Sequence, residues 1–168
     1  MKGIDEAQAL DLGAELELMR LLWAVENRMN ATSKHMRSRL GVTGPQRLVV
    51  RMVGRFPRIS ASRLSDLLLL HPSTITGILQ RLEKCGHVER EPDPDDGRSS
   101  LFSLTEAGRV LDVPSTGPVE MAVQRVLSRI PEERLVDARE LLTVLTQELF
   151  AGIQQECPLG AARPPGER

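Results

Sequence analysis

The sequence predicts a mainly α-helical fold that carries one small β-hairpin. Aromatic residues make up only 2% of the 168 residues, so the core must consist of Leu, Val, Ile and Met, as in helices packed on helices. Apolar residues recur at intervals of three, four and seven along most of the chain, which is the period of an amphipathic helix. A turn rich in Pro, Asp and Gly at 92–97 separates two short alternating segments, which is typical of a hairpin.

Two helices are expected in the N-terminal part of the chain. The first spans 12–40, where the apolar residues form one stripe, and Gly41 is a suitable stop. The second starts after Thr43, a candidate N-cap, has Pro45 in its first turn and ends near Gly54.

Two shorter helices follow and form a candidate helix-turn-helix pair. Ser60 is positioned to cap the third helix, and Pro72 begins the fourth, for which Gly86 is the expected C-cap. The fourth helix has one apolar stripe, made of Ile75, Ile78, Leu79 and Leu82. The remaining positions are small or polar and should face outward: Ser73, Thr74, Thr76, Gly77, Gln80, Arg81 and Lys84.

The hairpin and the C-terminal helices complete the predicted fold. Segments 87–91 and 99–104 alternate like strands, and the second should reach the core through Leu101 or Phe102 and Leu104. Pro114 and Pro118 must break or kink the helix that follows. Two further helices are expected at 119–130 and 131–153, the latter with Pro131 and two glutamates in its first turn.

The net charge of −1 hides a strong charge asymmetry along the chain. Residues 27–65 contain nine basic side chains and no acid, whereas acids outnumber bases in every other part. Such a block is what an anionic polymer would meet. The alternative is a set of solvated helix faces whose acids fall elsewhere.

Three short helices followed by a hairpin form a winged helix-turn-helix, and the fourth helix suits DNA recognition. A helix enters the major groove only if its exposed face is slim, and Ser, Thr and Gln bond base edges while Arg and Lys reach guanine or phosphate. The candidate DNA-binding residues are Ser60, Ser73, Thr74, Thr76, Gly77, Gln80, Arg81, Lys84 and, at the wing tip, Arg98. The alternative is a helical bundle with a merely polar surface.

Several ordered motifs make residues 41–111 resemble the MarR family of bacterial transcription regulators. They read Ser73-Thr74-Ile75-Thr76, Leu82-Glu83, Gly86-His87-Val88-Glu89-Arg90, Asp96-Gly97-Arg98 and Leu104-Thr105-Glu106-Ala107-Gly108. The resemblance implies an obligate homodimer on a palindromic operator, with recognition helices about 34 Å apart. It also implies that Arg98 enters the minor groove. Family members are mostly repressors that a small molecule, often anionic or phenolic, releases from DNA.

The resemblance divides the chain into four parts. Residues 1–40 would be an N-terminal dimerisation helix, 41–111 the DNA-binding domain, 112–156 the C-terminal dimerisation helices and 157–168 a disordered tail. The helices at 12–40 and 118–155 support this, since their Leu, Val and Met exceed what one small module can bury. The break at 112–118 departs from the family, in which this helix runs unbroken, and so does the acidic wing, where we expect Asp96 to orient the Arg98 guanidinium.

An effector pocket and a reactive thiol are two further candidate sites, and each has a simpler alternative. Trp23, His35, Arg47 and Arg51 would line an anionic-ligand pocket between the first two helices. The favoured alternative places Trp23 in the dimer core and the arginines toward DNA or solvent. Cys85 is more simply an inert thiol than a redox site. His71 is expected to cap the fourth helix, and we expect neither a metal nor a cofactor.

Other functional classes fit the sequence poorly. It has no Gly-rich phosphate loop, GxSxG or HExxH motif, so we do not expect an enzyme. No run of eighteen apolar residues or signal peptide is present, which favours the cytoplasm and excludes a membrane partner. The remaining alternative is a winged-helix protein-interaction module that does not bind DNA; its acidic wing favours it and the polar fourth helix speaks against it.

Overall fold

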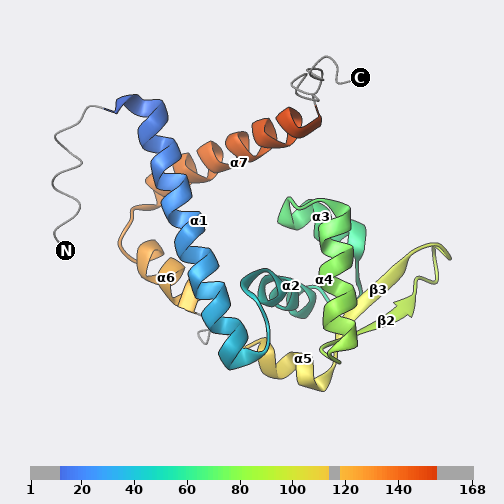
Figure 1. Cartoon of the computed structure of the whole chain (residues 1–168). Coiled ribbons are helices and arrows are strands. Elements are labelled where there is room, and N and C mark those ends of the chain that lie inside the picture. The colour runs from blue at the N-terminus through green and yellow to red at the C-terminus, as the bar shows by residue number, and fades with distance from the viewer. Residues whose placement is uncertain (1–11, 114–117, 155–168) are drawn as a thin grey trace, which may run out of the picture. The chain divides into compact units, whose positions relative to one another are not determined.

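The computed structural model describes residues 12–113 and 118–154, which form seven helices and three short strands (Figure 1). These residues divide into two compact units, one that ends at Ala122 and one that begins at Val123. The first unit contains the predicted winged helix-turn-helix. Residues 1–11 of the expected N-terminal dimerisation part and the expected tail at 157–168 lie outside the described residues.

Helix α1 (Gly13–Leu40) ends at the predicted stop, and α2 (Gly44–Arg55) begins at the predicted cap and ends one residue after Gly54. Gly41 adopts a φ of 73°, and its N–H donates to the Arg37 carbonyl at 3.1 Å, which closes α1. Thr43 caps α2 in a capping box with Gln46, whose side chain accepts from the Thr43 N–H at 2.8 Å. The two helices are joined by a bond of 2.8 Å from the Gly44 N–H to the Ser33 hydroxyl.

The helix-turn-helix pair consists of α3 (Ala61–Leu68) and α4 (Pro72–Lys84). Ser60 caps α3, and His71 caps α4 by accepting from the Ser73 N–H at 3.2 Å, so both predicted caps are confirmed. Cys85 is the C-cap of α4, and Gly86 follows it with a φ of 72°. The C-cap of α4 is thus one residue earlier than predicted, and Gly86 takes the left-handed position directly after it.

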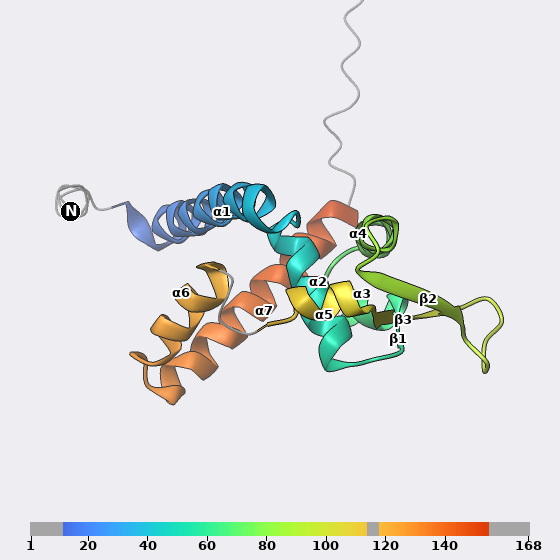
Figure 2. The same ribbon diagram turned by 90° about the horizontal axis from the view of Figure 1, so that it is seen from below.

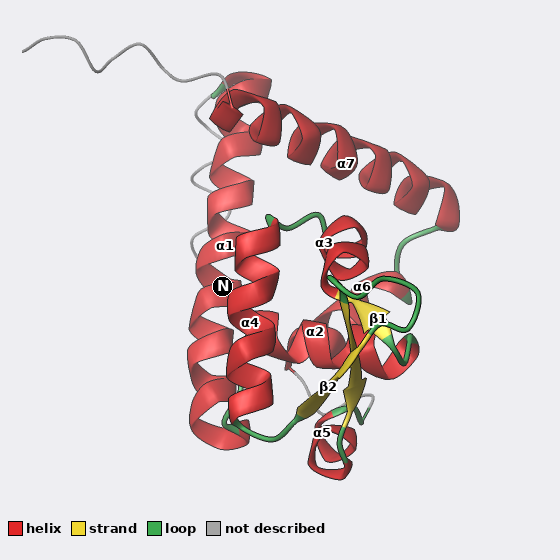
Figure 3. Cartoon of the chain, turned by 90° about the vertical axis from the view of Figure 1, so that its right-hand side faces the viewer, coloured by secondary structure: helices red, strands yellow, loops and turns green. Residues whose placement is uncertain are grey.

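The sheet has three strands rather than the two of the predicted hairpin. Strands β2 (Val88–Pro92) and β3 (Ser100–Leu104) form the wing, and β1 (Ile59–Ser60) pairs with the other edge of β3, giving the antiparallel order β1-β3-β2. A strand of two residues carries no alternation, so no sequence signal marked it. Figure 2 shows the turn between β2 and β3 projecting beyond the helices of the unit, and Figure 3 shows α3 and α4 beside the sheet.

The core of the first unit forms where α2 meets α3, α4 and the sheet. Its centre is the α2 stripe of Val49, Val50 and Val53, each with 0% exposure. Strand β3 reaches this core through Phe102 and Leu104, which settles the choice between Leu101 and Phe102. The other buried apolar members are Val42, Ile59, Leu64, Ile75, Ile78, Leu79, Leu82 and Val88. The predicted α4 stripe therefore packs into the core as a whole.

A close approach fixes helix α5 (Glu106–Leu111) against the turn that follows α4. Thr105 caps α5, and its hydroxyl donates to the Gly86 carbonyl at 2.6 Å. A Cβ on Gly108 would lie 2.0 Å from the His87 carbonyl oxygen, so only glycine fits at this position. The Leu-Thr-x-x-Gly motif thus has a structural reason, because Leu104 is buried in the core, Thr105 caps α5 and Gly108 allows the close backbone contact.

The helix after the wing is interrupted where the prolines predict. Helix α5 ends at Leu111 and α6 (Pro118–Leu127) begins at Pro118, while residues 114–117 lie outside the described residues. The first unit includes α6 as far as Ala122. The second unit holds the rest of α6 and α7 (Glu132–Gln154), and no described α7 side chain is buried.

Candidate nucleic-acid interface

The outward face of α4 is polar and open, as the sequence predicts. Ser73, Thr74, Thr76, Gln80, Arg81 and Lys84 are exposed, and Gly77 lies between them with no atom within 4 Å of where its Cβ would be. The side chains of Gln80, Arg81 and Lys84 make no hydrogen bond or ion pair with any described residue. These three side chains therefore remain available to an external ligand.

Two hydroxyl groups on α4 are already engaged with its own first turn. The Thr76 hydroxyl donates to the Pro72 carbonyl at 2.9 Å, and the Ser73 hydroxyl lies 2.7 Å from His71 Nδ1. A hydroxyl has a single proton, so Thr76 presents a methyl group and acceptor lone pairs to the outside rather than a donor. This geometry suits an exocyclic amine or the methyl group of thymine.

The acidic turn of the wing shapes the backbone that carries Arg98. Asp96 accepts a hydrogen bond from the backbone N–H of Arg98 at 3.0 Å, and Asp93 accepts one from the N–H of Asp95 at 3.0 Å. The expectation that the Asp96 carboxylate holds the Arg98 guanidinium is wrong, because the carboxylate is bonded to the main chain instead. The Arg98 guanidinium forms no ion pair among the described residues.

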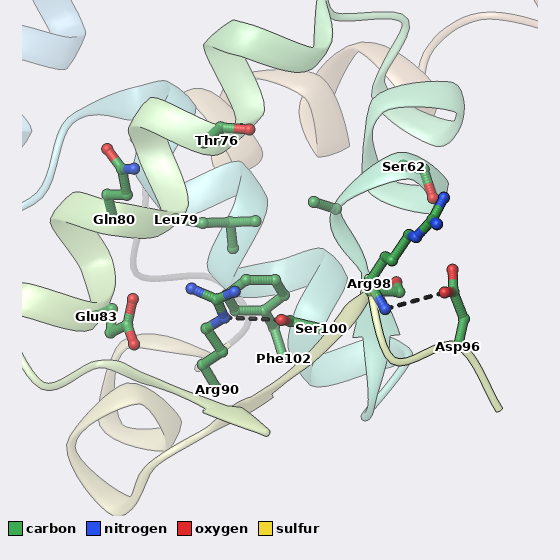
Figure 4. A pocket seen from close by; sticks show the side chains of 12 residues that line it. Ser62, Thr76, Leu79, Gln80, Glu83, Arg90, Asp96, Arg98, Ser100 and Phe102 are labelled. Atoms are coloured by element: carbon green, nitrogen blue, oxygen red, sulfur yellow. Dashed lines mark hydrogen bonds between the residues drawn. The ribbon is translucent and has the colours of Figure 1, made fainter. Parts of the chain in front are cut away.

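An open groove of about 350 Å³ joins the start of α3, the face of α4 and the wing. Figure 4 shows Thr76, Gln80 and Glu83 projecting from α4, with Arg90 and Arg98 on the wing side. The groove is lined by Ala61, Ser62, Thr76, Leu79, Gln80, Glu83, Arg90, Asp96, Arg98, Ser99, Ser100 and Phe102. The structure therefore brings predicted residues from α4 and the wing tip onto one surface.

Arg90 is a member of this surface that the sequence reasoning missed. It lies opposite Phe102 in the strand register, and its Nε donates to the Ser100 hydroxyl at 2.8 Å. The alternation of the strand could have placed Arg90 on this surface, since Arg90 and Val88 lie on the same face of β2 and Val88 is buried. Ser62 also lines the groove, whereas the predicted Ser60 lines a separate one and caps α3.

The four residues assigned to an effector pocket do not gather in one site. Trp23 is 60% exposed on α1, and His35 is exposed as well. Arg47 is buried, with 2% exposure, and pairs with Glu120 at 2.5 Å. Arg51 pairs with Asp112 at 2.6 Å. Because both arginines are engaged with acids of the same unit, neither the expected pocket nor the alternative of DNA-facing or solvated arginines describes them.

The described residues hold neither a cluster of metal ligands nor a membrane-spanning helix. No three His, Cys, Asp or Glu side chains in the described ranges come together as metal ligands would. None of the described helices combines the length and the apolar character needed to cross a bilayer. The thiol of Cys85 is exposed at the end of α4.

Comparison with known proteins decides the family. A profile of the MarR family matches residues 20–99. The organic hydroperoxide resistance transcriptional regulator of Bacillus subtilis (strain 168) is 32% identical over 107 residues, which cover 61% of this chain and 73% of that protein. This chain belongs to the MarR family.

Other MarR-family proteins agree in sequence and in fold. An HTH-type transcriptional repressor of Mycobacterium tuberculosis (strain ATCC 25618 / H37Rv) is 33% identical over 99 residues, or 58% of this chain and 71% of the repressor. A mutant MarR from E. coli, complexed with operator DNA, has 25% identity and a TM-score of 0.62 over 81% of this chain and 99% of that chain. The chain is thus a DNA-binding transcription regulator of the MarR family, and its relatives are regulators rather than enzymes.

Proposed function

We propose that this chain is a repressor that binds a palindromic operator as a homodimer and acts in the cytoplasm. Each protomer would place α4 in the major groove and the wing tip in the adjacent minor groove. The observation that carries the proposal is the single surface on which the open face of α4 and Arg98 border the same groove. The side chains of Gln80, Arg81 and Lys84 on α4 make no hydrogen bond or ion pair with any described residue, and the Arg98 guanidinium forms no ion pair among them.

The chemistry of α4 divides its residues into two roles. Gln80 can form a bidentate pair with adenine, while Thr76 offers acceptor lone pairs and a methyl group, so these two would read bases. Ser73, Thr74 and the free N–H groups of the first turn would hold a phosphate. Gly77 keeps the helix slim enough for close approach, and Arg81 and Lys84 would reach guanine or the backbone.

Exposed apolar side chains on the long helices support a homodimer. In the first unit, α1 exposes Leu16, Leu21, Trp23, Val25 and Met29, each at 48% or more. In the second unit, α7 exposes Val136, Leu141, Leu142, Val144 and Leu149, each at 49% or more. Exposed apolar side chains in such number on two long helices favour an interface. A two-fold dimer would present two α4 helices to the two halves of a palindrome.

The names of the relatives support the proposed direction of regulation. Those from Mycobacterium tuberculosis and Mycobacterium bovis are named transcriptional repressors, which favours repression here. We also propose that a small-molecule effector acts on this chain. The Bacillus subtilis relative is named for resistance to organic hydroperoxides, but we assign no chemical class to the effector of this chain. The engaged state of Arg47 and Arg51 removes the two cations that the sequence offered to an anionic effector.

A binding experiment with promoter DNA tests the proposal. The purified chain is mixed with the DNA upstream of its own gene and of neighbouring genes, in competition with random DNA, and the retained fragment is sequenced. We expect retention of one palindromic fragment by a species of twice the mass of the chain in sedimentation. Retention of no fragment would favour the alternative, a winged-helix protein-interaction module that does not bind DNA. Retention by a monomer would contradict the dimer.

A further inference from the structure

One face of α2 carries two arginines and a glycine at helical spacing. Arg47, Arg51 and Gly54 are separated by four and three residues, so they lie in line on one side of the helix. All three contact the segment at which the chain leaves α5. The apolar residues Val49, Val50 and Val53 occupy the core side of the same helix, so the arginine face has a separate role.

Arg47 holds both ends of the interruption between α5 and α6. Its Nη1 donates to the Leu111 carbonyl at 2.7 Å and its Nη2 to the Val113 carbonyl at 2.9 Å. Its Nε donates to the Glu120 carboxylate in the first turn of α6 at 2.5 Å. One buried guanidinium thus bonds the chain before residues 114–117 and the chain after them.

Arg51 and Gly54 fix the residue between these contacts. Arg51 Nη1 donates to the Asp112 carboxylate at 2.6 Å and also to the Asp112 backbone carbonyl. A Cβ on Gly54 would lie 2.2 Å from the Asp112 carboxylate, so the glycine makes room for this side chain. We call Arg47 and Arg51, together with Asp112 and Glu120, the α2 clamp.

The energetics of the clamp favour a role in geometry over a role in stability. Removing charges from water offsets much of the attraction within a buried ion pair, so such pairs contribute little net stability. In the described structure Glu120 Oε2 is buried and has no hydrogen-bond partner, which adds to this cost. The fork of a guanidinium nevertheless fixes the direction of each bond that it donates. The clamp therefore restrains position more than it stabilises the fold.

We propose that the α2 clamp sets the position of α6 relative to the DNA-binding elements and so determines the half-site spacing that the protein accepts. A continuous helix would impose that position through its own backbone, and here the prolines interrupt it. The clamp replaces the missing hydrogen-bond ladder with side-chain bonds across the interruption. This inference rests on the proposed homodimer, in which the helices at the two ends of the chain join the protomers.

The test compares operators of two spacings, using three forms of the full chain. The forms are wild type, the double variant Asp112→Asn with Glu120→Gln, and the control Glu17→Gln. The control makes the same acid-to-amide change in an exposed pair with Arg20 on α1, which is not part of the clamp. One base pair inserted between the half-sites separates them by about 3.4 Å and rotates them by roughly a tenth of a turn. Affinity is measured on the natural and the lengthened operator.

Wild type and the Glu17→Gln control should lose about tenfold in affinity on the lengthened operator. The double variant should lose about threefold or less, because its α6 can adjust, while binding the natural operator about fivefold more weakly. Each amide keeps an oxygen that can accept from its arginine, and the variant residues lie outside the apolar core, so the winged unit should stay folded, which circular dichroism checks before binding is measured. The proposal would be overturned if the folded double variant lost as much affinity on the lengthened operator as wild type does.

Hydrogen–deuterium exchange of the same three forms separates this inference from the proposed function. The peptides covering 109–113 and 118–125 should exchange at least about threefold faster in the double variant, whereas those from α4 should be unchanged. If wild type binds no operator, the proposed function fails and the exchange result alone decides whether the clamp exists. Equal exchange in all three forms would show that the clamp restrains nothing.

Discussion

Replacement of Gly108 by alanine tests the structural explanation given for the Leu-Thr-x-x-Gly motif that follows the wing. Gly108 lies in α5, where helix propensity alone predicts that alanine stabilises by about 1 kcal/mol. The structure predicts the opposite sign. The new Cβ would lie 2.0 Å from the His87 carbonyl oxygen and 3.0 Å from its carbonyl carbon. Since both are backbone atoms in a tight turn, α5 and the turn must separate.

The magnitude follows from the two hydrogen bonds that join α5 to the turn. The Thr105 N–H donates to the His87 carbonyl at 3.2 Å, and the Thr105 hydroxyl donates to the Gly86 carbonyl at 2.6 Å. At about 1 kcal/mol each, their loss costs about 2 kcal/mol. Subtracting the propensity gain of about 1 kcal/mol leaves a net loss of about 1 kcal/mol. For a chain of this length that lowers Tm by about 2–4 °C.

Thermal unfolding followed by circular dichroism measures this change, with Gly77→Ala as the matched control. Gly77 is also a helical glycine, but no atom lies within 4 Å of its added Cβ, so that variant should gain about 1 kcal/mol. The two substitutions should therefore shift Tm in opposite directions. A Gly108→Ala variant as stable as the Gly77→Ala variant would refute the close-contact explanation.

Three further outcomes concern operator binding and follow from the candidate interface. Arg98→Ala should weaken binding about tenfold without changing Tm, whereas Arg55→Ala, which removes another exposed arginine, on α2, should leave affinity within about twofold. Equal effects of the two substitutions would refute a local wing contact. Thr76→Ala and Gln80→Ala should each reduce the affinity ratio between operator and random DNA about fivefold or more. Lys84→Ala should weaken both DNAs alike and lower the slope of log affinity against log salt by about one, and a change in the ratio instead would contradict its phosphate role.

The sequence predicted the helices, their caps and the outward face of α4. Each of these features depends on local physics: the 3.6-residue period, one polar side chain at a helix N-terminus, or one glycine at a C-terminus. The interruption of the helix after the wing was equally readable, because proline lacks the N–H that a helix interior needs. The motifs from Ser73 to Gly108 were sufficient to predict the family that the comparisons show.

What the sequence left open depends on contacts between distant residues. Arg47 and Arg51 read as ligands for an anion or DNA, yet their partners lie 61 to 73 positions further along the chain. Asp96 was near Arg98 in sequence, but the turn directed its carboxylate to the backbone N–H rather than to the guanidinium.

The short strand β1 and the place of Arg90 in the groove likewise exist only through their pairing with β3. Local propensity determines where an element begins and which residues share a face. Only the packed fold decides which charges meet, because an ion pair forms where two faces are brought within a few ångströms and water is excluded, and no periodicity in the sequence encodes that distance.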